Sequence, residues 1–416
     1  MQAPKLLIVS GFWPTQDNPI TGVFVVQQVA ALARLGVSIT VLLTKTIGRP
    51  ASPFLTVSEL NLPTDKVAIE LSVTARLPER LSEPYFALRL NAWLAGLFYS
   101  RAIKKIVKSG GGFSGSIVHG SRYANMSLPM WRGKVTGRVV AVLHGVDPLL
   151  ARASQRRGMQ ALYAGFTESS EAIALVGSPL RKHASSLGVP ESKQIVVSNG
   201  TDLPSGAGAP SHEADSRTKV RIVSVSNLIE LKGIDHNLIA LAELSGRSPD
   251  LEFEYVIVGD GPEKDKLISL SEELNLSGQV HFLGRLPYLD TMEEISRGDF
   301  FSLPSWGEAF GIVYLEAMAR GKPVIGCYEN GAEDIFEHGK QGFLINPKDT
   351  NALSDYLERL IEDPSLRLTM GAAAYMRAQD FTWETNAQKM LELLGFQGQV
   401  ADNEIGNEAL PKAEFT

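Results

Sequence analysis

The feature that most constrains this chain is a series of short apolar strands alternating with helices, which is interrupted once and then restarts. The first series contains a strand at Lys5–Ser10, a helix at Val23–Leu35 and a strand at Val37–Leu43. Residues 201–219, rich in Pro, Gly, Ser and charge, are typical of an exposed linker. A strand at Val220–Ser226 opens the second series. Because strand–helix–strand units build parallel sheets, the sequence predicts an α/β fold with two Rossmann-like, doubly wound domains facing a cleft.

The linker divides the chain into an N-terminal domain over residues 1–203 and a C-terminal domain over residues 204–380. A helix over 381–396 is expected to pack back on the N-terminal domain. The polar tail, 397–416, is expected to be disordered.

Charge is distributed unevenly between the two halves. Residues 1–203 hold 22 Lys and Arg against 11 Asp and Glu, and residues 204–416 hold 18 against 35. A balance of +11 beside one of −17 indicates different partners for the two domains. The basic first domain favours an anionic membrane surface or an anionic substrate. The alternative interpretation is that the charges are scattered without function.

The chain shows no signal-peptide pattern and no run near the roughly 18 apolar residues that span a bilayer. Its single cysteine, Cys327, excludes an internal disulfide and fits a reducing compartment. We therefore expect a cytoplasmic protein that contacts a membrane only as a peripheral protein at the inner face.

The strongest chemical signal is the segment EAFGIVYLE at 308–316, which follows a strand and begins a helix. Gly311 lets the backbone approach a ligand closely. The free N–H groups of Gly311, Ile312 and Val313 at the helix start can bind phosphate. Glu308 and Glu316 supply two carboxylates that accept hydrogen bonds from sugar hydroxyls. The alternative is a pair of surface glutamates near a helix.

This segment resembles the E-x7-E motif of retaining GT-B glycosyltransferases, group 1, family four, which include sucrose synthases and bacterial mannosyltransferases of phosphatidylinositol. The resemblance covers about residues 5–395. The opening GFWP…NPITGVFVVQQ, at 11–28, is similar to bacterial cell-surface polysaccharide enzymes of the teichuronic-acid type. The resemblance implies a hexosyltransferase that moves a sugar from a UDP- or GDP-linked donor to a lipid-linked saccharide acceptor. The C-terminal domain would bind the donor, and the N-terminal domain would bind the acceptor.

The resemblance also implies roles for residues of the second half. Lys232 matches the lysine that clamps the nucleotide diphosphate, and a lysine is well suited to a phosphate. Asn227 stands where the family has an arginine, and Arg285 would compensate for that charge.

In the E-x7-E segment, Glu308 would act in catalysis and Glu316 would hold the ribose. The backbone of Phe310, Gly311 and Ile312 would place the sugar and the phosphates.

In the first half, Gly22 precedes a helix and would let backbone N–H groups contact the donor phosphate. His144 ends a strand and aligns with a family histidine near the transferred sugar, which makes it a catalytic candidate. His119 also ends a strand and would line the acceptor side. A purely structural role is the alternative for both histidines.

No Asp-x-Asp pair occurs in the sequence, and metal-dependent sugar transferases of the other main fold use such a pair. We therefore expect no metal or other cofactor. We also expect no nucleic-acid partner. Two alternative functions remain: a nucleotide-sugar epimerase of the same two-domain architecture, and a non-catalytic protein that binds sugar nucleotides.

The segment Pro84–Lys108 carries a separate hypothesis. It combines aromatic and aliphatic residues with Arg101, Lys104, Lys105 and Lys108 at its end. A helix of this composition can dock at an anionic bilayer. The alternative is a core helix with a basic end.

Overall fold

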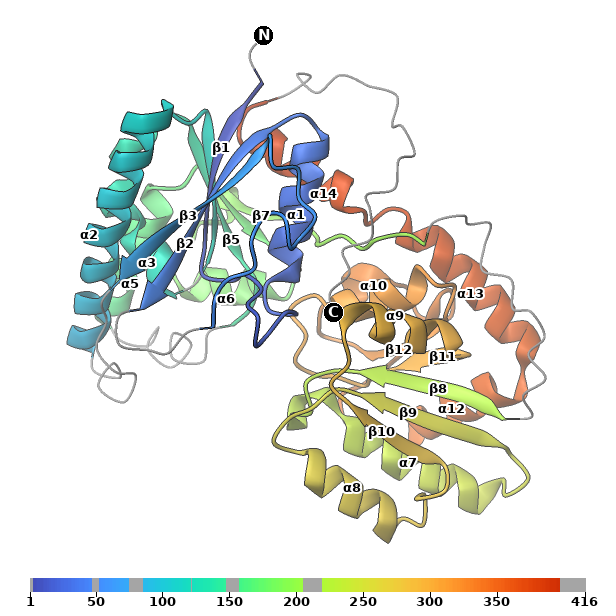
Figure 1. The fold of residues 1–416 in the computed structure, drawn as a ribbon. Helices are drawn as coiled ribbons and strands as arrows, with labels where there is room; N and C mark the ends of the chain where they lie inside the picture. Colours follow the sequence, from blue (N-terminus) through green and yellow to red (C-terminus); the bar gives the residue numbers. More distant parts are fainter. Residues whose placement is uncertain are drawn as a thin grey trace. The chain divides into compact units, whose positions relative to one another are not determined.

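The computed structural model describes residues 3–46, 52–74, 85–120, 122–146, 157–204 and 219–396. These residues form two compact units (Figure 1). The first unit contains the described residues up to Asn199 and those from Trp383 onward, and the second contains Gly200–Thr382. The tail 397–416, most of the linker and Pro84 lie outside the described residues.

A parallel sheet of seven strands forms the centre of the first unit, in the order β3-β2-β1-β4-β5-β6-β7. The strands are β1 Lys5–Ser10, β2 Ser38–Thr46, β3 Val67–Thr74, β4 Gly115–His119, β5 Arg138–Leu143, β6 Ala172–Leu175 and β7 Gln194–Val196. The helices are α1 Val23–Arg34, α2 Tyr85–Gly110, α3 Arg122–Trp131, α5 Arg157–Glu168, α6 Leu180–Ser186 and α14 Trp383–Leu393.

The apolar run of β1 is the core of this unit. Leu6, Leu7, Ile8 and Val9 are all fully buried, so both faces of the strand are covered. That burial explains why β1 is a continuous apolar run instead of alternating apolar and polar residues.

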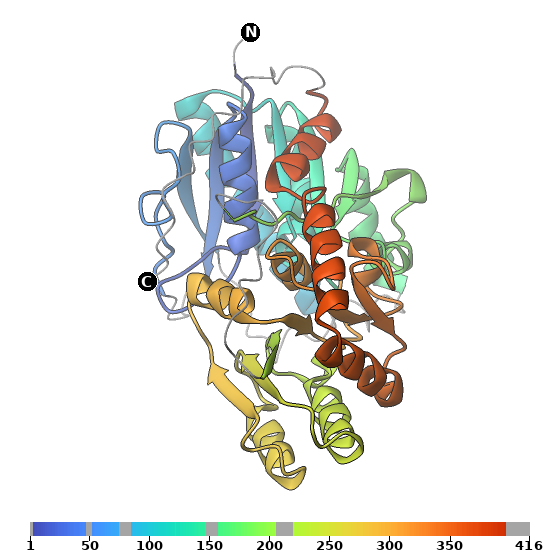
Figure 2. The same cartoon turned by 90° about the vertical axis from the view of Figure 1, so that its right-hand side faces the viewer.

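The C-terminal helix α14 packs against α1 in the first unit (Figure 2). Gln28 of α1 donates from Nε2 to Asn386 Oδ1 at 2.6 Å, and Asn386 donates from Nδ2 to the Ser198 carbonyl at 2.7 Å. At the edge of this contact, the Arg34 Nε donates to Glu384 at 2.8 Å. Buried amide hydrogen bonds of this kind specify one register of the two helices.

The second unit has a six-stranded parallel sheet in the order β10-β9-β8-β11-β12-β13. The strands are β8 Val220–Val225, β9 Phe253–Val258, β10 Val280–Gly284, β11 Phe300–Ser302, β12 Val324–Cys327 and β13 Gly342–Ile345. The helices are α7 Ile234–Arg247, α8 Lys264–Glu273, α9 Tyr288–Arg297, α10 Ile312–Met318, α11 Ala332–Ile335, α12 Thr350–Glu362 and α13 Pro364–Ala378. Two parallel-sheet, Rossmann-like domains confirm the predicted fold.

Each sheet has one point where the strand order reverses. In the first sheet this point lies between β1 and β4, and in the second between β8 and β11. Open α/β sheets bind ligands outside the carboxyl ends of the strands at such a point. The loops after β1, β4, β8 and β11 are therefore where a site is expected.

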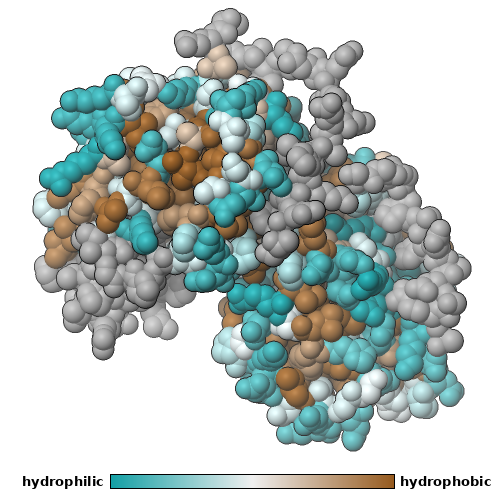
Figure 3. Space-filling view, in the orientation of Figure 1, coloured by the Kyte–Doolittle hydropathy of each residue, from teal (hydrophilic) through white to brown (hydrophobic). Residues whose placement is uncertain are grey.

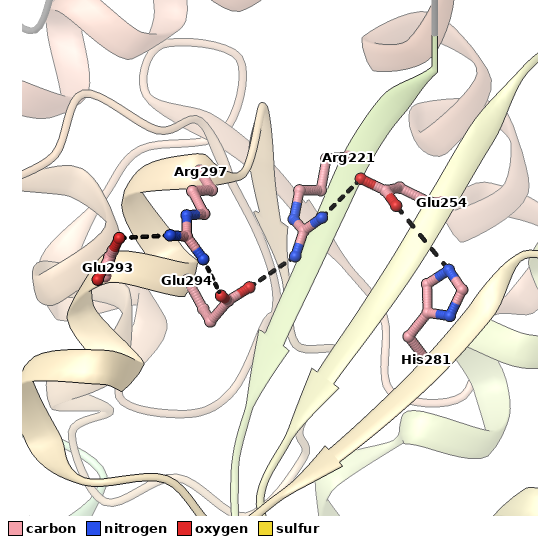
Figure 4. Close-up of polar contacts among 6 residues, drawn as sticks. All are labelled: Arg221, Glu254, His281, Glu293, Glu294 and Arg297. Carbon is pink, nitrogen blue, oxygen red and sulfur yellow. Dashed lines mark hydrogen bonds and ion pairs between the residues drawn. The ribbon is translucent and has the colours of Figure 1, made fainter. Parts of the chain in front are cut away.

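An ion-pair network ties α9 to the opposite, amino ends of the strands in the second unit (Figure 4). Arg221 of β8 contacts Glu254 of β9 at 2.7 Å and Glu294 of α9 at 2.6 Å. Arg297, Glu293 and His281 extend this network at its two ends. Helix α9 begins at Tyr288, near the carboxyl ends of the strands. The network therefore fixes one end of the helix whose other end carries Tyr288, a residue of the site described below.

Candidate functional site

Lys232 and Glu308 form an ion pair in the second unit. Lys232 ends a single 3-10 turn after β8, and Glu308 lies in the loop between β11 and α10. The Lys232 Nζ donates to Glu308 Oε1, and the two side chains are only 17% and 12% exposed. Because β8 and β11 are neighbours in the sheet, their loops bring together two charges that are 76 residues apart in the sequence.

Hydrogen bonds between three loops hold this pair in place. Ser305 donates from Oγ to the Leu231 carbonyl at 3.0 Å, next to Lys232. Asn330, in the loop after β12, donates from Nδ2 to the Ser305 carbonyl at 2.7 Å, and Gly331 N–H donates to the Glu308 carbonyl at 3.0 Å. The ion pair therefore lies on a braced framework at the carboxyl ends of β8, β11 and β12.

The segment between Glu308 and α10 turns at Gly311. Its φ is 94°, and a Cβ there would lie 2.6 Å from Cδ2 of Tyr314, so only glycine fits. Phe310 is 2% exposed, and its ring packs on that of Phe381 with centroids 6.3 Å apart. Phe310 is therefore a core residue, while partly exposed Ile312 begins α10.

Glu316 lies in the second turn of α10 and is partly buried. Burial raises the pKa of its carboxyl from 4.5 to about 7, although Arg320 acts in the opposite direction. The charge of Asp202 also raises the pKa of Glu316, whereas a hydrogen bond from the Tyr288 hydroxyl lowers it. Near neutral pH this carboxyl is therefore partly protonated.

Asn227 and Arg285 lie farther along the same edge of the sheet. Asn227 follows β8 and Arg285 follows β10, and both side chains are exposed. Since β9 lies between β8 and β10, the structure does not place Arg285 on the strand next to Lys232.

In the first unit, Gly22 closes the loop after β1. It has φ 77° immediately before α1, and a Cβ would lie 2.6 Å from the backbone of Phe12 and Trp13. His144 follows β5, and its ring lies 4.5 Å from the ring of Phe24 and 5.7 Å from that of Phe12. His144 is therefore held between two aromatic rings and remains partly exposed.

The prediction that His119 lines the acceptor side is wrong, because this residue is 1% exposed. His119 ends β4, which pairs with β1 on one side and β5 on the other. The His119 side chain lies inside the core. Its Nδ1 lies 2.9 Å from Nε2 of His144. Burial lowers the pKa of both rings, that of His144 to about 3, and the proximity of His144 lowers the pKa of His119 further, so both rings are neutral near pH 7.

Two residues of this region were missed from the sequence, Tyr288 and Asn330. Tyr288 follows β10 and Asn330 follows β12, so both lie at the edge of the second sheet that holds the carboxyl ends of its strands. This position is the signal that identifies them, because polar residues after parallel strands gather at one edge of the sheet.

Comparison with known proteins agrees with this architecture. Residues 21–204 match the family Glycosyltransferase Family 4, and residues 211–377 match Glycosyl transferases group 1. The D-inositol 3-phosphate glycosyltransferase of Corynebacterium jeikeium is 36% identical over 182 residues, 42% of this chain and 43% of that protein. The match thus spans less than half the length of that relative.

A longer match joins the chain to a GDP-mannose-dependent alpha-(1-6)-phosphatidylinositol monomannoside mannosyltransferase of Mycolicibacterium smegmatis. That relative is 28% identical over 286 residues, 64% of this chain and 72% of the relative.

Solved structures share the fold. Anabaena HepE in complex with UDP and glucose superposes with a TM-score of 0.67 and 19% identity, covering 94% of this chain and 99% of that one. The sucrose-phosphate synthase of Thermosynechococcus elongatus gives 0.70 and 20%, with coverage of 94% and 98%. With a family 4 domain in its first half and a group 1 domain in its second, the chain belongs to the group 1 glycosyltransferases of the GT-B fold.

Proposed function

We propose that this protein transfers a sugar, with retention of anomeric configuration, from a UDP- or GDP-linked donor to a saccharide acceptor. The observation that carries the proposal is the shielded Lys232–Glu308 pair at the switch point of the second unit. The names of a relative and a structural neighbour, which mention GDP-mannose and UDP with glucose, support a nucleotide-sugar donor.

In this proposal the diphosphate of the donor replaces Glu308 as the ion-pair partner of the Lys232 ammonium. The ammonium then neutralises the charge that grows on the leaving diphosphate, the main electrostatic requirement of the reaction. The released Glu308 carboxylate accepts hydrogen bonds from the sugar, and the Glu316 carboxylate accepts them from the ribose diol. Asn227 and Arg285, on the same edge of the sheet, would contact the nucleotide.

The acceptor hydroxyl would attack the anomeric carbon on the face that the diphosphate leaves. The bond from this carbon to the phosphate oxygen breaks as the new glycosidic bond forms, and the hydroxyl proton passes to the departing phosphate oxygen. His144 and the loop that ends at Gly22 would contact the donor from the first unit. Because Lys232 supplies the positive charge, we propose that no metal or other cofactor takes part.

Calorimetry with UDP, GDP and ADP in the presence of EDTA tests the donor. We expect one nucleoside diphosphate to bind, and the corresponding sugar nucleotide to yield a glycoside only when a saccharide acceptor is added. NMR of the product should show the anomeric configuration of the donor. Absence of binding by all three diphosphates, or a new sugar nucleotide formed from donor alone as an epimerase would give, would contradict the proposal.

We further infer that the acceptor is lipid-linked, at the inner face of a membrane, in the synthesis of a cell-surface polysaccharide. Helix α2 supports this inference, because it contains no acidic residue. Its inner face, with Tyr99 and Ile103, is buried, whereas Trp93 is 51% exposed. No helix among the described residues is long and apolar enough to cross a bilayer.

The exposed side of α2 combines an aromatic residue with cations. Trp93 and Lys104 are three turns apart and so share a face, and Arg101, Lys105 and Lys108 are exposed as well. In Figure 3 the border of the first unit where α2 lies in Figure 1 is hydrophilic in its upper part and hydrophobic below it. A tryptophan beside several lysines is the composition that binds the interface of an anionic bilayer.

Sedimentation with phosphatidylcholine vesicles, with and without phosphatidylglycerol, tests this surface. Since a basic residue near an anionic membrane contributes about 1 kcal/mol, Lys104→Glu with Lys108→Glu should weaken binding to the anionic vesicles on the order of tenfold or more. The control is Lys266→Glu with Lys340→Glu, the same charge change at lysines 70% and 63% exposed in the second unit. Equal binding by the two double variants would refute docking through α2.

A further inference from the structure

The two histidines His119 and His144 of the first unit form a hydrogen-bonded pair, of which the proposed mechanism uses only His144. His119 Nδ1 and His144 Nε2 are 2.9 Å apart, and the two rings are nearly coplanar, with centroids 5.2 Å apart and planes 19° apart. His119 is in the core, whereas His144 is partly exposed between Phe12 and Phe24. One ring is thus inaccessible and the other is available to a ligand.

Only one proton lies between the two rings, so the pair has two possible arrangements. If His144 donates from Nε2, the single proton of neutral His119 lies on its own Nε2. That atom is buried and has no hydrogen-bond partner in the described part of the chain. A buried N–H without a partner is destabilising, because the group loses its hydrogen bonds to water and gains none in return.

The opposite arrangement avoids this cost. If His119 donates from Nδ1, its Nε2 carries no hydrogen, and buried acceptors without a partner are tolerated better than buried donors. His144 then accepts at Nε2 and carries its own proton on Nδ1. That nitrogen is the one not used by His119, and it is left to donate to a ligand.

We propose that His119 is a positioning residue for sugar transfer: by donating to Nε2 of His144, it holds His144 as the Nδ1–H tautomer, a hydrogen-bond donor for an oxygen of the transferred sugar. The proposal rests on the proposed function and deepens it, because it assigns a direction to the hydrogen bond of His144. Rotation of the His144 ring would break its bond to His119, so the pair also fixes the orientation of the ring.

The tautomer can be measured without any substrate. In protein labelled with 15N-histidine, long-range 1H–15N spectra distinguish the two neutral tautomers, and a His144→Gln variant assigns the signal. We expect Nδ1–H for His144 in the wild type and a mixture of tautomers in His119→Phe, which keeps a ring and lacks the N–H. An Nε2–H tautomer of His144 in the wild type would overturn the proposal.

Kinetics supply the second measurement. His119→Phe should lower kcat/KM on the order of tenfold to a hundredfold, since a misplaced catalytic group costs this much. Binding of the nucleoside diphosphate should stay unchanged. His119→Asn, whose amide can still donate, should recover most of the rate, and equal rates in both variants would contradict the proposal. A wild type that transfers no sugar would refute the proposed function instead, and the NMR result would still decide the tautomer.

Discussion

Replacing Lys232 with methionine is expected to lower kcat by about 10²–10³-fold, the usual cost of removing one preorganised charge from the leaving-group side of a reaction. Methionine keeps most of the side-chain length and removes only the charge. The variant also leaves the Glu308 carboxylate, 12% exposed, without its cation. The free energy of unfolding should therefore fall by about 1–3 kcal/mol. Steady-state kinetics and urea unfolding measure the two effects separately.

Two further variants separate charge from folding. Lys232→Met combined with Glu308→Gln should recover most of the stability, because no unpaired carboxylate remains, while turnover stays low. Lys266→Met is the matched control: this lysine also pairs with a glutamate of its own unit, at 2.8 Å, but is 70% exposed. It should change neither quantity appreciably. Turnover of Lys232→Met within a fewfold of the wild type would exclude the role given to this lysine.

Glu316 should make the stability of the protein depend on pH. Its pKa is about 7 in the folded protein against 4.5 for an ordinary glutamate, so the folded state holds the proton more tightly. The stabilisation is fully present below pH 4.5 and is lost as the pH rises through 7. The shift corresponds to about 3 kcal/mol. Urea unfolding of the wild type and of Glu316→Gln across this range should show the difference between them change by this amount, in favour of the variant at high pH.

Donor binding should follow the opposite trend. Only the carboxylate form of Glu316 accepts two hydrogen bonds from the ribose diol, so nucleotide affinity should fall as the pH drops below about 7. Glu316→Gln should bind more weakly and lose this pH dependence. Glu272→Gln, at an exposed glutamate of α8, should keep the wild-type profile. A wild-type profile in Glu316→Gln would assign the pH dependence to another group.

The fold and one part of the site follow from general rules. Alternating strands and helices predict parallel sheets, and residues after the strands meet at one edge, which places Lys232 and Glu308 at the same edge of one sheet. The direct pairing of these charges could not be predicted, because it requires the order of β8 and β11 in the sheet and the lengths of two loops.

Other features depend on packing that periodicity does not encode. His119 ends a strand as a functional residue would, yet the helices that cover the sheet decide whether such a side chain is exposed. Tyr288 reaches Glu316 because α9 lies beside α10, and nothing in the sequence relates the two residues. The Phe310 ring belongs to the recognised segment, yet it packs in the core of the second unit against Phe381.

The Lys232–Glu308 pair also bears on selectivity. A cation that already has an internal counterion binds other anions weakly, because the binding energy of each anion must first offset the loss of the existing ion pair. Inorganic phosphate or a sugar monophosphate offers too few additional interactions for that exchange, whereas a sugar nucleotide brings a ribose and a base as well. The resting protein would thus ignore the abundant small anions of a cell and respond only to the complete activated sugar.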